Sequence, residues 1–228
     1  MKPIISVAID GPSGAGKSTI ARAAAKRFGL IYVDTGAIYR TVAHAVHTAG
    51  ADCADAAAVS AMLPGLEITM NYDENGVQRM FLGGEDVSDA IRLPENSLRA
   101  SQVSALPEVR AFLLDMQREL AKKHSVIMDG RDIGTVVLPD ATVKIFLTAS
   151  AERRAERRYR ELAQKRVDTT FAEVLRDIEA RDYADSHRDA APLRQAEDAV
   201  PLDTSSLDLA ESIDAVCEII RPHWEART

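Results

Sequence analysis

Short apolar runs recur along the chain, separated by stretches in which apolar side chains follow helical spacing. We predict a strand for each of five runs, at residues 4–10, 30–34, 125–129, 143–147 and 199–202. Strands that alternate with helices form a parallel sheet covered on both faces, with ligands bound at the carboxyl ends of the strands. The pattern therefore predicts an α/β fold built on a five-stranded parallel sheet.

Two segments interrupt this alternation. Residues 66–90 contain two alternating runs around Asp73-Glu74-Asn75-Gly76, which predicts an antiparallel hairpin with Asn-Gly in its turn. We expect this hairpin to belong to an insertion that extends to about residue 105. Residues 151–166 predict an arginine-rich helix, and the alanine-rich residues 51–61 a further helix.

Composition narrows the class of protein. With 228 residues, 46% of them hydrophobic and 28% charged, the chain can bury an ample core. A net charge of −7 argues against broad nucleic-acid binding. No apolar run approaches a membrane span, the start lacks a secretory pattern, and Cys53 and Cys217 lie far apart. We therefore expect a cytoplasmic protein, without a nucleic-acid or membrane partner.

The segment Gly11–Ser18 fits the pattern G-x-x-x-x-G-K-[ST] at every fixed position. It follows a predicted strand and precedes a helix that we expect to end at Gly29, so phosphate would meet both the loop amides and a helix N-terminus. Lys17 would reach the β- and γ-phosphates, and the Ser18 hydroxyl would bind Mg²⁺. The predicted ATP-binding residues are Gly11, Pro12, Ser13, Gly14, Ala15, Gly16, Lys17, Ser18 and Thr19.

Polar residues at other strand ends point to a second substrate. Asp34 follows the second predicted strand, where it could also cap the next helix, and Asp129-Gly130-Arg131-Asp132 follows the third. Further along, Arg181, Asp185 and Arg188 are spaced to face one side of a helix. A switch GTPase would need an N-K-x-D segment and a motor ATPase a strand ending in Asp-Glu, and the sequence has neither. Of these three classes of nucleotide-binding protein, the small-molecule kinase remains.

Six segments together resemble bacterial cytidylate kinases, in the order of that family and over most of the chain: DGPSGAGKST, DTGAIYR, ASQVSALPEVR, DGRDIGTVVLPDA, VKIFLTAS and RDYADSHRDAAPL. The resemblance implies the P-loop nucleoside monophosphate kinase fold. It places the P-loop core at residues 1–36, 104–150 and 170–228, and a lid at residues 151–169. The nucleoside-monophosphate-binding domain would span residues 37–103, with an insertion around residues 62–103 that contains the small antiparallel sheet.

The resemblance also implies residue roles. Arg40, Arg131 and Arg188 would hold the phosphate of CMP, with Arg181 close to the transferred group. Ser101, Arg110 and Asp132 would bind the cytosine edge, and Asp185 the sugar hydroxyls. Thr35 completes the predicted CMP-binding set. Cytosine offers an amino donor at N4 that a carboxylate accepts, whereas uracil has an acceptor there, so Asp132 would select cytosine.

The predicted reaction transfers the γ-phosphate of ATP to CMP or dCMP in line, with Mg²⁺ as cofactor. The predicted catalytic residues are Lys17, Arg131, Arg153, Arg157 and Arg181, and no general base is expected because the acceptor oxygen is already ionised. Another P-loop small-molecule kinase, a non-enzymatic nucleotide-dependent sensor and an RNA-binding protein are the alternatives. We expect a monomer.

Overall fold

The computed structural model describes residues 3–93 and 95–227, which divide into two compact units. The first unit comprises Met1–Tyr32 and Ala121–Thr228, and the second comprises Val33–Leu120. None of the helices in the described ranges is both long enough and apolar enough to cross a membrane. Each unit is described below by itself.

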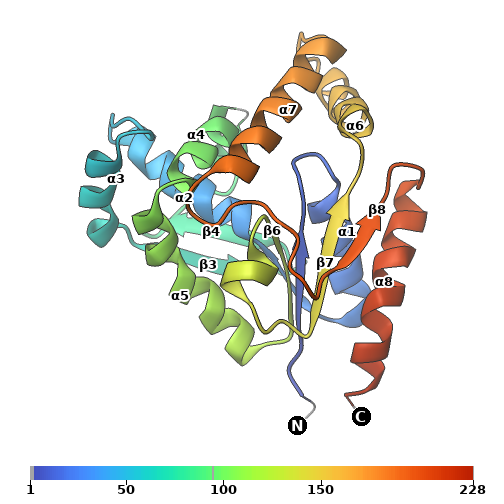
Figure 1. The fold of residues 1–228 in the computed structure, drawn as a ribbon. Helices are drawn as coiled ribbons and strands as arrows, with labels where there is room; N and C mark the ends of the chain where they lie inside the picture. Colours follow the sequence, from blue (N-terminus) through green and yellow to red (C-terminus); the bar gives the residue numbers. More distant parts are fainter. Residues whose placement is uncertain (1–2, 94, 228) are drawn as a thin grey trace. The chain divides into compact units, whose positions relative to one another are not determined.

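The first unit is built on a five-stranded sheet in the order β2-β6-β1-β7-β8 (Figure 1). β1 pairs in parallel with β6 and with β7, and β7 pairs in parallel with β8. The five predicted strands are thereby confirmed to within two residues at each end. Their bounds are β1 Ser6–Asp10, β2 Ile31–Asp34, β6 Val126–Gly130, β7 Val143–Thr148 and β8 Val200–Asp203; the last two residues of β2 group with the second unit.

One face of this sheet is covered by α1 (Lys17–Phe28) and α8 (Leu209–Glu225), which share a core with β1 and β7. α1 buries its apolar side chains toward that core and ends at Gly29, which adopts φ 62°, as the sequence predicted. A short π-helical turn, η3 (Ile133–Val137), packs against β1 and β6. The carboxyl ends of β1 and β6 thus carry the polar segments predicted there.

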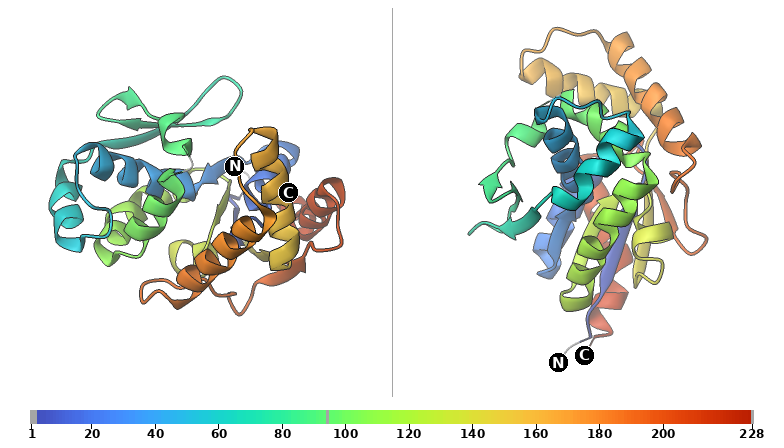
Figure 2. Two further views of the ribbon diagram at one scale, coloured as in Figure 1. Left: turned by 90° about the horizontal axis from the view of Figure 1, so that it is seen from above. Right: turned by 90° about the vertical axis from the view of Figure 1, so that its left-hand side faces the viewer.

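Two helices of the first unit form a hairpin with a small core of its own. α6 (Ala151–Gln164) and α7 (Phe171–His187) lie side by side in both views of Figure 2 and pack around Ala155, Val174 and Ile178. On its exposed side α6 carries ion pairs such as Arg160–Glu156, so part of the arginine-rich segment is a solvated face.

The second unit contains the predicted hairpin within a three-stranded sheet, ordered β3-β4-β5. β3 and β4 pair antiparallel around the Asp73–Gly76 turn, in which Gly76 has φ 72°. The predicted helix at residues 51–61 is shorter and begins only at Ala56, because Asp55 caps it. The remaining bounds are α2 Thr35–Thr48, α3 Ala56–Met62, η1 Leu63–Gly65, β3 Ile68–Tyr72, β4 Gln78–Leu82, β5 Glu85–Asp86, η2 Ala90–Arg92, α4 Glu95–Ser104 and α5 Pro107–Lys123.

The parallel sheet and the separate small antiparallel sheet confirm the predicted fold class. The predicted domain bounds, which came from the resemblance, stay predictions.

Candidate active site

The predicted phosphate loop lies between β1 and α1, and its backbone requires glycine. Gly11 has φ 151°, and a Cβ there would lie 1.9 Å from the carbonyl oxygen of Leu147 at the end of β7. Gly16 precedes α1 with φ 88° and offers no side-chain cap, whereas Asp34, Thr170 and Asp208 cap their helices with a side chain. Within the described part of the chain, no side chain at the N-cap accepts from the first N–H groups of α1, which suits a bound phosphate.

Lys17 is buried and folds back onto its own loop. Its Nζ donates to the carbonyl oxygens of Gly11 and Pro12, both at 2.7 Å. Burial, reinforced by the positive charge of Arg131, lowers the pKa of Lys17 well below its usual value, while Asp129 and Asp10 oppose that shift. An anion placed at the loop would supply the negative charge that this buried ammonium group requires.

Asp129 joins the loop to the end of β6. Its Oδ2 accepts a hydrogen bond from Ser18 Oγ at 2.8 Å, and its Oδ1 accepts one from Tyr32 Oη at 2.8 Å. A serine hydroxyl beside a carboxylate is an all-oxygen donor set of the kind that Mg²⁺ prefers. These residues fit the predicted magnesium ion, and Asp129 is a metal-site candidate, whereas the sequence pointed only to a second substrate at its segment. The position of Asp129 at the end of an apolar strand was the feature of the sequence that could have indicated its role.

Asp10 ties the two strand ends of this site together. Its carboxylate accepts from the backbone N–H groups of Ile133 and Gly134 at 2.8 and 2.7 Å, directly after Asp132. Burial raises the pKa of Asp10 to about 6, although both backbone hydrogen bonds lower it. Asp10, which directly precedes the phosphate loop, thus holds the backbone that follows Arg131 and Asp132.

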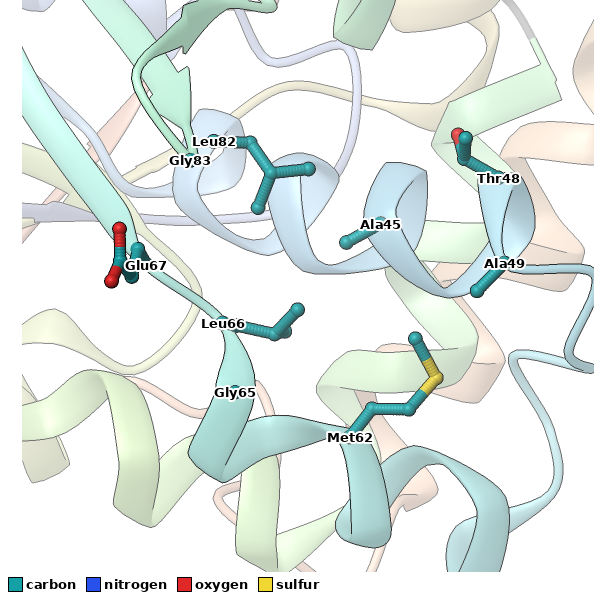
Figure 3. A pocket seen from close by; sticks show the side chains of 9 residues that line it. All are labelled: Ala45, Thr48, Ala49, Met62, Gly65, Leu66, Glu67, Leu82 and Gly83. Atoms are coloured by element: carbon teal, nitrogen blue, oxygen red, sulfur yellow. The ribbon is translucent and has the colours of Figure 1, made fainter.

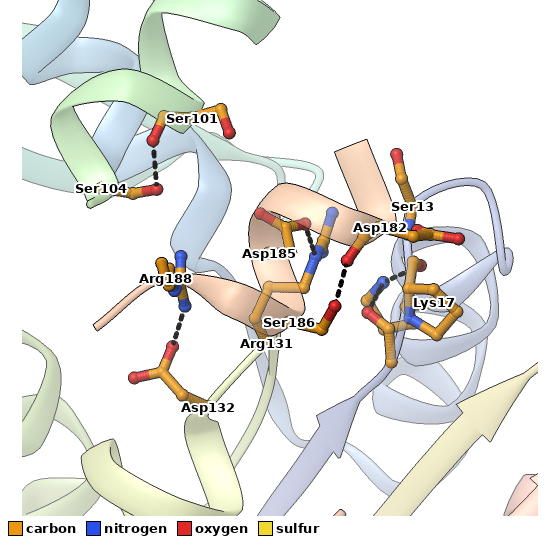
Figure 4. A network of polar contacts seen from close by, with 12 residues as sticks. Ser13, Lys17, Ser101, Ser104, Arg131, Asp132, Asp182, Asp185, Ser186 and Arg188 are labelled. Atoms are coloured by element: carbon orange, nitrogen blue, oxygen red, sulfur yellow. Dashed lines mark hydrogen bonds and ion pairs between the residues drawn. The ribbon is translucent and has the colours of Figure 1, made fainter. Parts of the chain in front are cut away.

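Four of the predicted acceptor residues pair with one another across the first unit (Figure 4). Arg131 Nε donates to Asp185 Oδ2 at 2.7 Å, and Arg188 Nη2 lies 3.4 Å from Asp132 Oδ1. Burial alone would raise the pKa of Asp185, but Arg131, Arg181 and Arg188 together hold it below its usual value. A cluster of opposite charges with little exposure to solvent suits a polar ligand that carries charge of its own.

The expected single helical face for these residues needs a correction. Asp185 lies within α7, but the helix ends at His187, and Arg188 follows it with an extended backbone. The Arg188 guanidinium is held instead by the carbonyl oxygen of Ala191, to which Nη2 donates at 2.7 Å. Ala191 has φ 49°, a left-handed conformation that is uncommon for alanine, so a tight turn rather than the helix places Arg188.

Arginines of α6 hold the phosphate loop from outside. Arg157 Nη1 donates to the carbonyl oxygen of Ala15 at 3.3 Å, whereas Arg153 donates to Ser205 and pairs with Glu156 on the exposed side. The buried Arg154, which the sequence did not single out, donates to the carbonyl oxygen of Ser13 at 2.9 Å.

Asp182 of α7 completes this contact with the loop. Its Oδ2 lies 2.6 Å from Arg154 Nη1, and its Oδ1 accepts from the backbone N–H of Ser13 at 3.3 Å. Both backbone polar groups of Ser13 are therefore bound by the α6–α7 hairpin. Helical spacing in the sequence does not predict these contacts with Ser13, because they depend on how the two helices pack against the loop.

Four predicted CMP-binding residues lie in the second unit. Asp34 caps α2 and pairs with Arg40 Nη2 at 2.9 Å, directly beside Thr35. Ser104 links the other two: its Oγ donates to the Ser101 carbonyl oxygen at 2.9 Å, and its own carbonyl accepts from Arg110 Nη1 at 3.0 Å. Arg110 also lies over the Tyr39 ring, 5.5 Å from its centroid.

The second unit also contains a hollow of about 540 Å³ that includes none of the predicted site residues (Figure 3). Its lining is mostly apolar and offers one carboxylate and no cation, so it lacks the groups that bind phosphate. The lining residues are Ala45, Thr48, Ala49, Met62, Gly65, Leu66, Glu67, Leu82 and Gly83.

Known proteins resemble this chain over most of its length. The family model described as cytidylate kinase matches residues 7–222. A cytidylate kinase of Lactiplantibacillus plantarum is 48% identical over 219 residues, which cover 96% of each chain. The chain belongs to the cytidylate kinase family. A cytidylate kinase of Lactobacillus gasseri is 47% identical over 218 residues, 96% of this chain and 94% of that relative.

Membership of the cytidylate kinase family confirms the resemblance seen in the six segments. Among solved structures, an uncharacterized protein from Eubacterium ventriosum matches with a TM-score of 0.53 at 11% identity, covering 98% of this chain and 99% of that one. At that identity the likeness concerns the fold alone.

Proposed function

We propose that this chain transfers the γ-phosphoryl group of ATP to CMP or dCMP. The observation that carries the proposal is a phosphate loop in the same unit as two pairs of a partly buried arginine with a buried aspartate, in a chain that belongs to the cytidylate kinase family. One set of groups suits a triphosphate donor, and the other suits a second charged substrate.

For the donor, Lys17 and the loop amides are proposed to bind the phosphates of ATP. The Lys17 ammonium already lies within the loop, and the carbonyl contacts that hold it are ones a phosphate could replace. Ser18 and Asp129 would hold Mg²⁺, together with water. When bound, that ion neutralises charge on the phosphate oxygens.

For the acceptor, Arg131, Arg188 and Arg40 are proposed to hold the CMP phosphate, and Arg181 to lie close to the transferred group. An arginine fork matches two phosphate oxygens and keeps its charge at every working pH. Asp185 would accept from the sugar hydroxyls, and Asp132 from the cytosine amino group. Thr35, Ser101 and Arg110 are assigned to the same substrate.

The chain needs no general base for this reaction, since the attacking oxygen of CMP is ionised at neutral pH. Catalysis rests on alignment of the two phosphates and on positive charge around the transferred group. Arg153 and Arg157 of α6 are proposed to supply part of that charge, and the hairpin to exclude water as a competing acceptor. The cytoplasmic location and the monomeric state stay predictions.

An acceptor panel tests the proposal. ADP release from Mg-ATP would be measured with CMP, dCMP, UMP, AMP or shikimate as acceptor. We expect strong stimulation by CMP and dCMP and weak stimulation by the others. Preference for AMP or shikimate would indicate a different small-molecule kinase, and slow release that no acceptor stimulates would indicate a nucleotide sensor.

A further inference from the structure

Asp34 occupies a central position among the proposed acceptor residues of the second unit. Its Oδ1 accepts from the backbone N–H of Ala37 at 2.9 Å and so starts α2, while its Oδ2 pairs with Arg40. Thr35 follows it directly in the chain. The position of the Asp34 peptide therefore determines where the Thr35 hydroxyl and the Arg40 guanidinium lie.

Gln78, the first residue of β4, binds both backbone polar groups of Asp34. Its Oε1 accepts from the Asp34 N–H at 2.8 Å, and its Nε2 donates to the Asp34 carbonyl oxygen at 3.2 Å. The two bonds together fix which end of the amide is oxygen. Gln78 is only 4% exposed and lies 44 residues along the chain from Asp34. The side-chain amide takes the place that a neighbouring strand would otherwise fill.

We propose that Gln78 is a positioning residue for the acceptor nucleotide, and that the small antiparallel sheet acts on the acceptor site through it. This inference rests on the proposed function. It goes beyond the roles assigned above, because the role of Gln78 is to fix Asp34, Thr35 and Arg40 and not to bind the substrate itself.

Arg40 shows why this position matters. Its Nη2 is engaged by Asp34, but among the described residues its buried Nε has no hydrogen-bond partner. An arginine whose Nε–H lacks an acceptor donates readily to a phosphate oxygen, and the geometry of such a bond is strict. A small shift of the start of α2 would move the guanidinium out of line with the acceptor phosphate.

A side chain of similar size cannot replace Gln78, because both the donor and the acceptor of its amide are used. Glutamate in its place would keep an acceptor for the Asp34 N–H but lose the donor and set a second carboxylate against Asp34. Leucine would leave two buried peptide groups without this partner. Ser88 offers a matched control, because it is 2% exposed and its Oγ accepts from the N–H of Met80 at 2.8 Å, two residues further along β4.

The experiment compares Gln78→Leu, Gln78→Glu and Ser88→Ala with the wild type, in KM for CMP, KM for ATP, kcat and thermal unfolding. We expect both Gln78 variants to raise KM for CMP by about tenfold, the effect of weakening one charge-assisted hydrogen bond. In the Gln78 variants, KM for ATP should stay within about twofold of the wild-type value. In Ser88→Ala, both KM values should stay within about twofold of wild type.

A double-mutant cycle with Arg40→Met tests the route. If Gln78 acts through Arg40, Gln78→Leu should change KM for CMP by less than about twofold in the Arg40→Met background. Fully additive effects would overturn that route.

The outcomes separate this inference from the proposed function. A wild-type enzyme that phosphorylates CMP, with Gln78→Glu matching it in KM for CMP, would overturn the role of Gln78 even if Gln78→Leu did not fold. Equal rises in both KM values, or an equal effect of Ser88→Ala, would show a merely structural role. A wild type without CMP-dependent ADP release would instead overturn the proposed function.

Discussion

Asp129 and Asp132 lie three residues apart at the end of β6, yet their partners differ. Asp129 accepts from two hydroxyl groups, those of Ser18 and Tyr32, whereas Asp132 faces the guanidinium of Arg188 at 3.4 Å. Both are almost fully buried. Two hydroxyl partners suit the metal-side role proposed for Asp129, and a guanidinium partner suits the ligand-side role proposed for Asp132.

Asp132→Asn tests the ligand-side role. The asparagine amide can donate to the O4 atom of uracil, so we expect the ratio of kcat/KM for CMP over UMP to fall by about tenfold to a hundredfold. Steady-state kinetics with the two nucleotides give this ratio directly. The exposed Asp140→Asn is the control, since it makes the same change of charge further along the chain. An unchanged ratio in Asp132→Asn would show that Asp132 does not read the base.

At the scale of elements, the α6–α7 hairpin holds the phosphate loop through the backbone of one residue. Arg154 of α6 and Asp182 of α7 pair with each other, and between them they bind the carbonyl and the N–H of Ser13. The buried stem of Arg154 also lies 3.2 Å from where a Cβ on Gly14 would be. The hairpin therefore fixes the shape of the loop at two adjacent residues.

Asp182→Asn weakens this contact while keeping the size of the side chain. Without the charge, the pair with Arg154 loses its electrostatic part and the loop at Ser13 is held less firmly. We expect KM for ATP to rise by about fivefold, with a smaller change in KM for CMP. The control is Asp177→Asn, an exposed position on the same helix. A rise confined to KM for CMP would mean that Asp182 serves the acceptor, through its neighbours on α7, rather than the loop.

Local patterns predicted most of the elements but few of the contacts between them. The apolar runs located all five strands, and the Asn-Gly turn located the hairpin of β3 and β4, because each pattern reflects local backbone preference and one-sided burial. Arg154 and Gln78 escaped prediction because their partners, Ser13 and Asp34, are remote in sequence. The position of Arg188 depends on a turn at Ala191, and the conformational preference of alanine does not predict that turn.

At the scale of the whole molecule, burial of Asp10 makes stability depend on pH. Burial raises its pKa from 3.8 to about 6, so the folded chain holds this proton to a higher pH than the unfolded chain does. The contribution of the protonated form is fully present below pH 3.8 and is lost as pH rises through about 6. Other carboxylates, Asp185 among them, have lowered pKa values and act in the opposite direction.

The contribution of Asp10 is measured by comparing wild type with Asp10→Asn, which does not titrate. Between pH 4 and 7 we expect the free energy of unfolding of wild type to fall by about 2 kcal/mol relative to that of the variant. Denaturant unfolding at several pH values provides the measurement. Parallel pH profiles for the two proteins would mean that Asp10 titrates normally in the folded chain.

The whole molecule is proposed to unite a donor loop with an acceptor site, and the fate of the γ-phosphorus atom tests this most directly. The measurement is ³¹P NMR of wild type and Lys17→Ala, each incubated with Mg-ATP and CMP. We expect wild type to form CDP and ADP in equal amounts with little inorganic phosphate. Lys17→Ala should be slower by about a hundredfold or more, since it removes a charge at the transferred group. Inorganic phosphate in place of CDP, or equal rates for the two proteins, would contradict phosphoryl transfer by this loop.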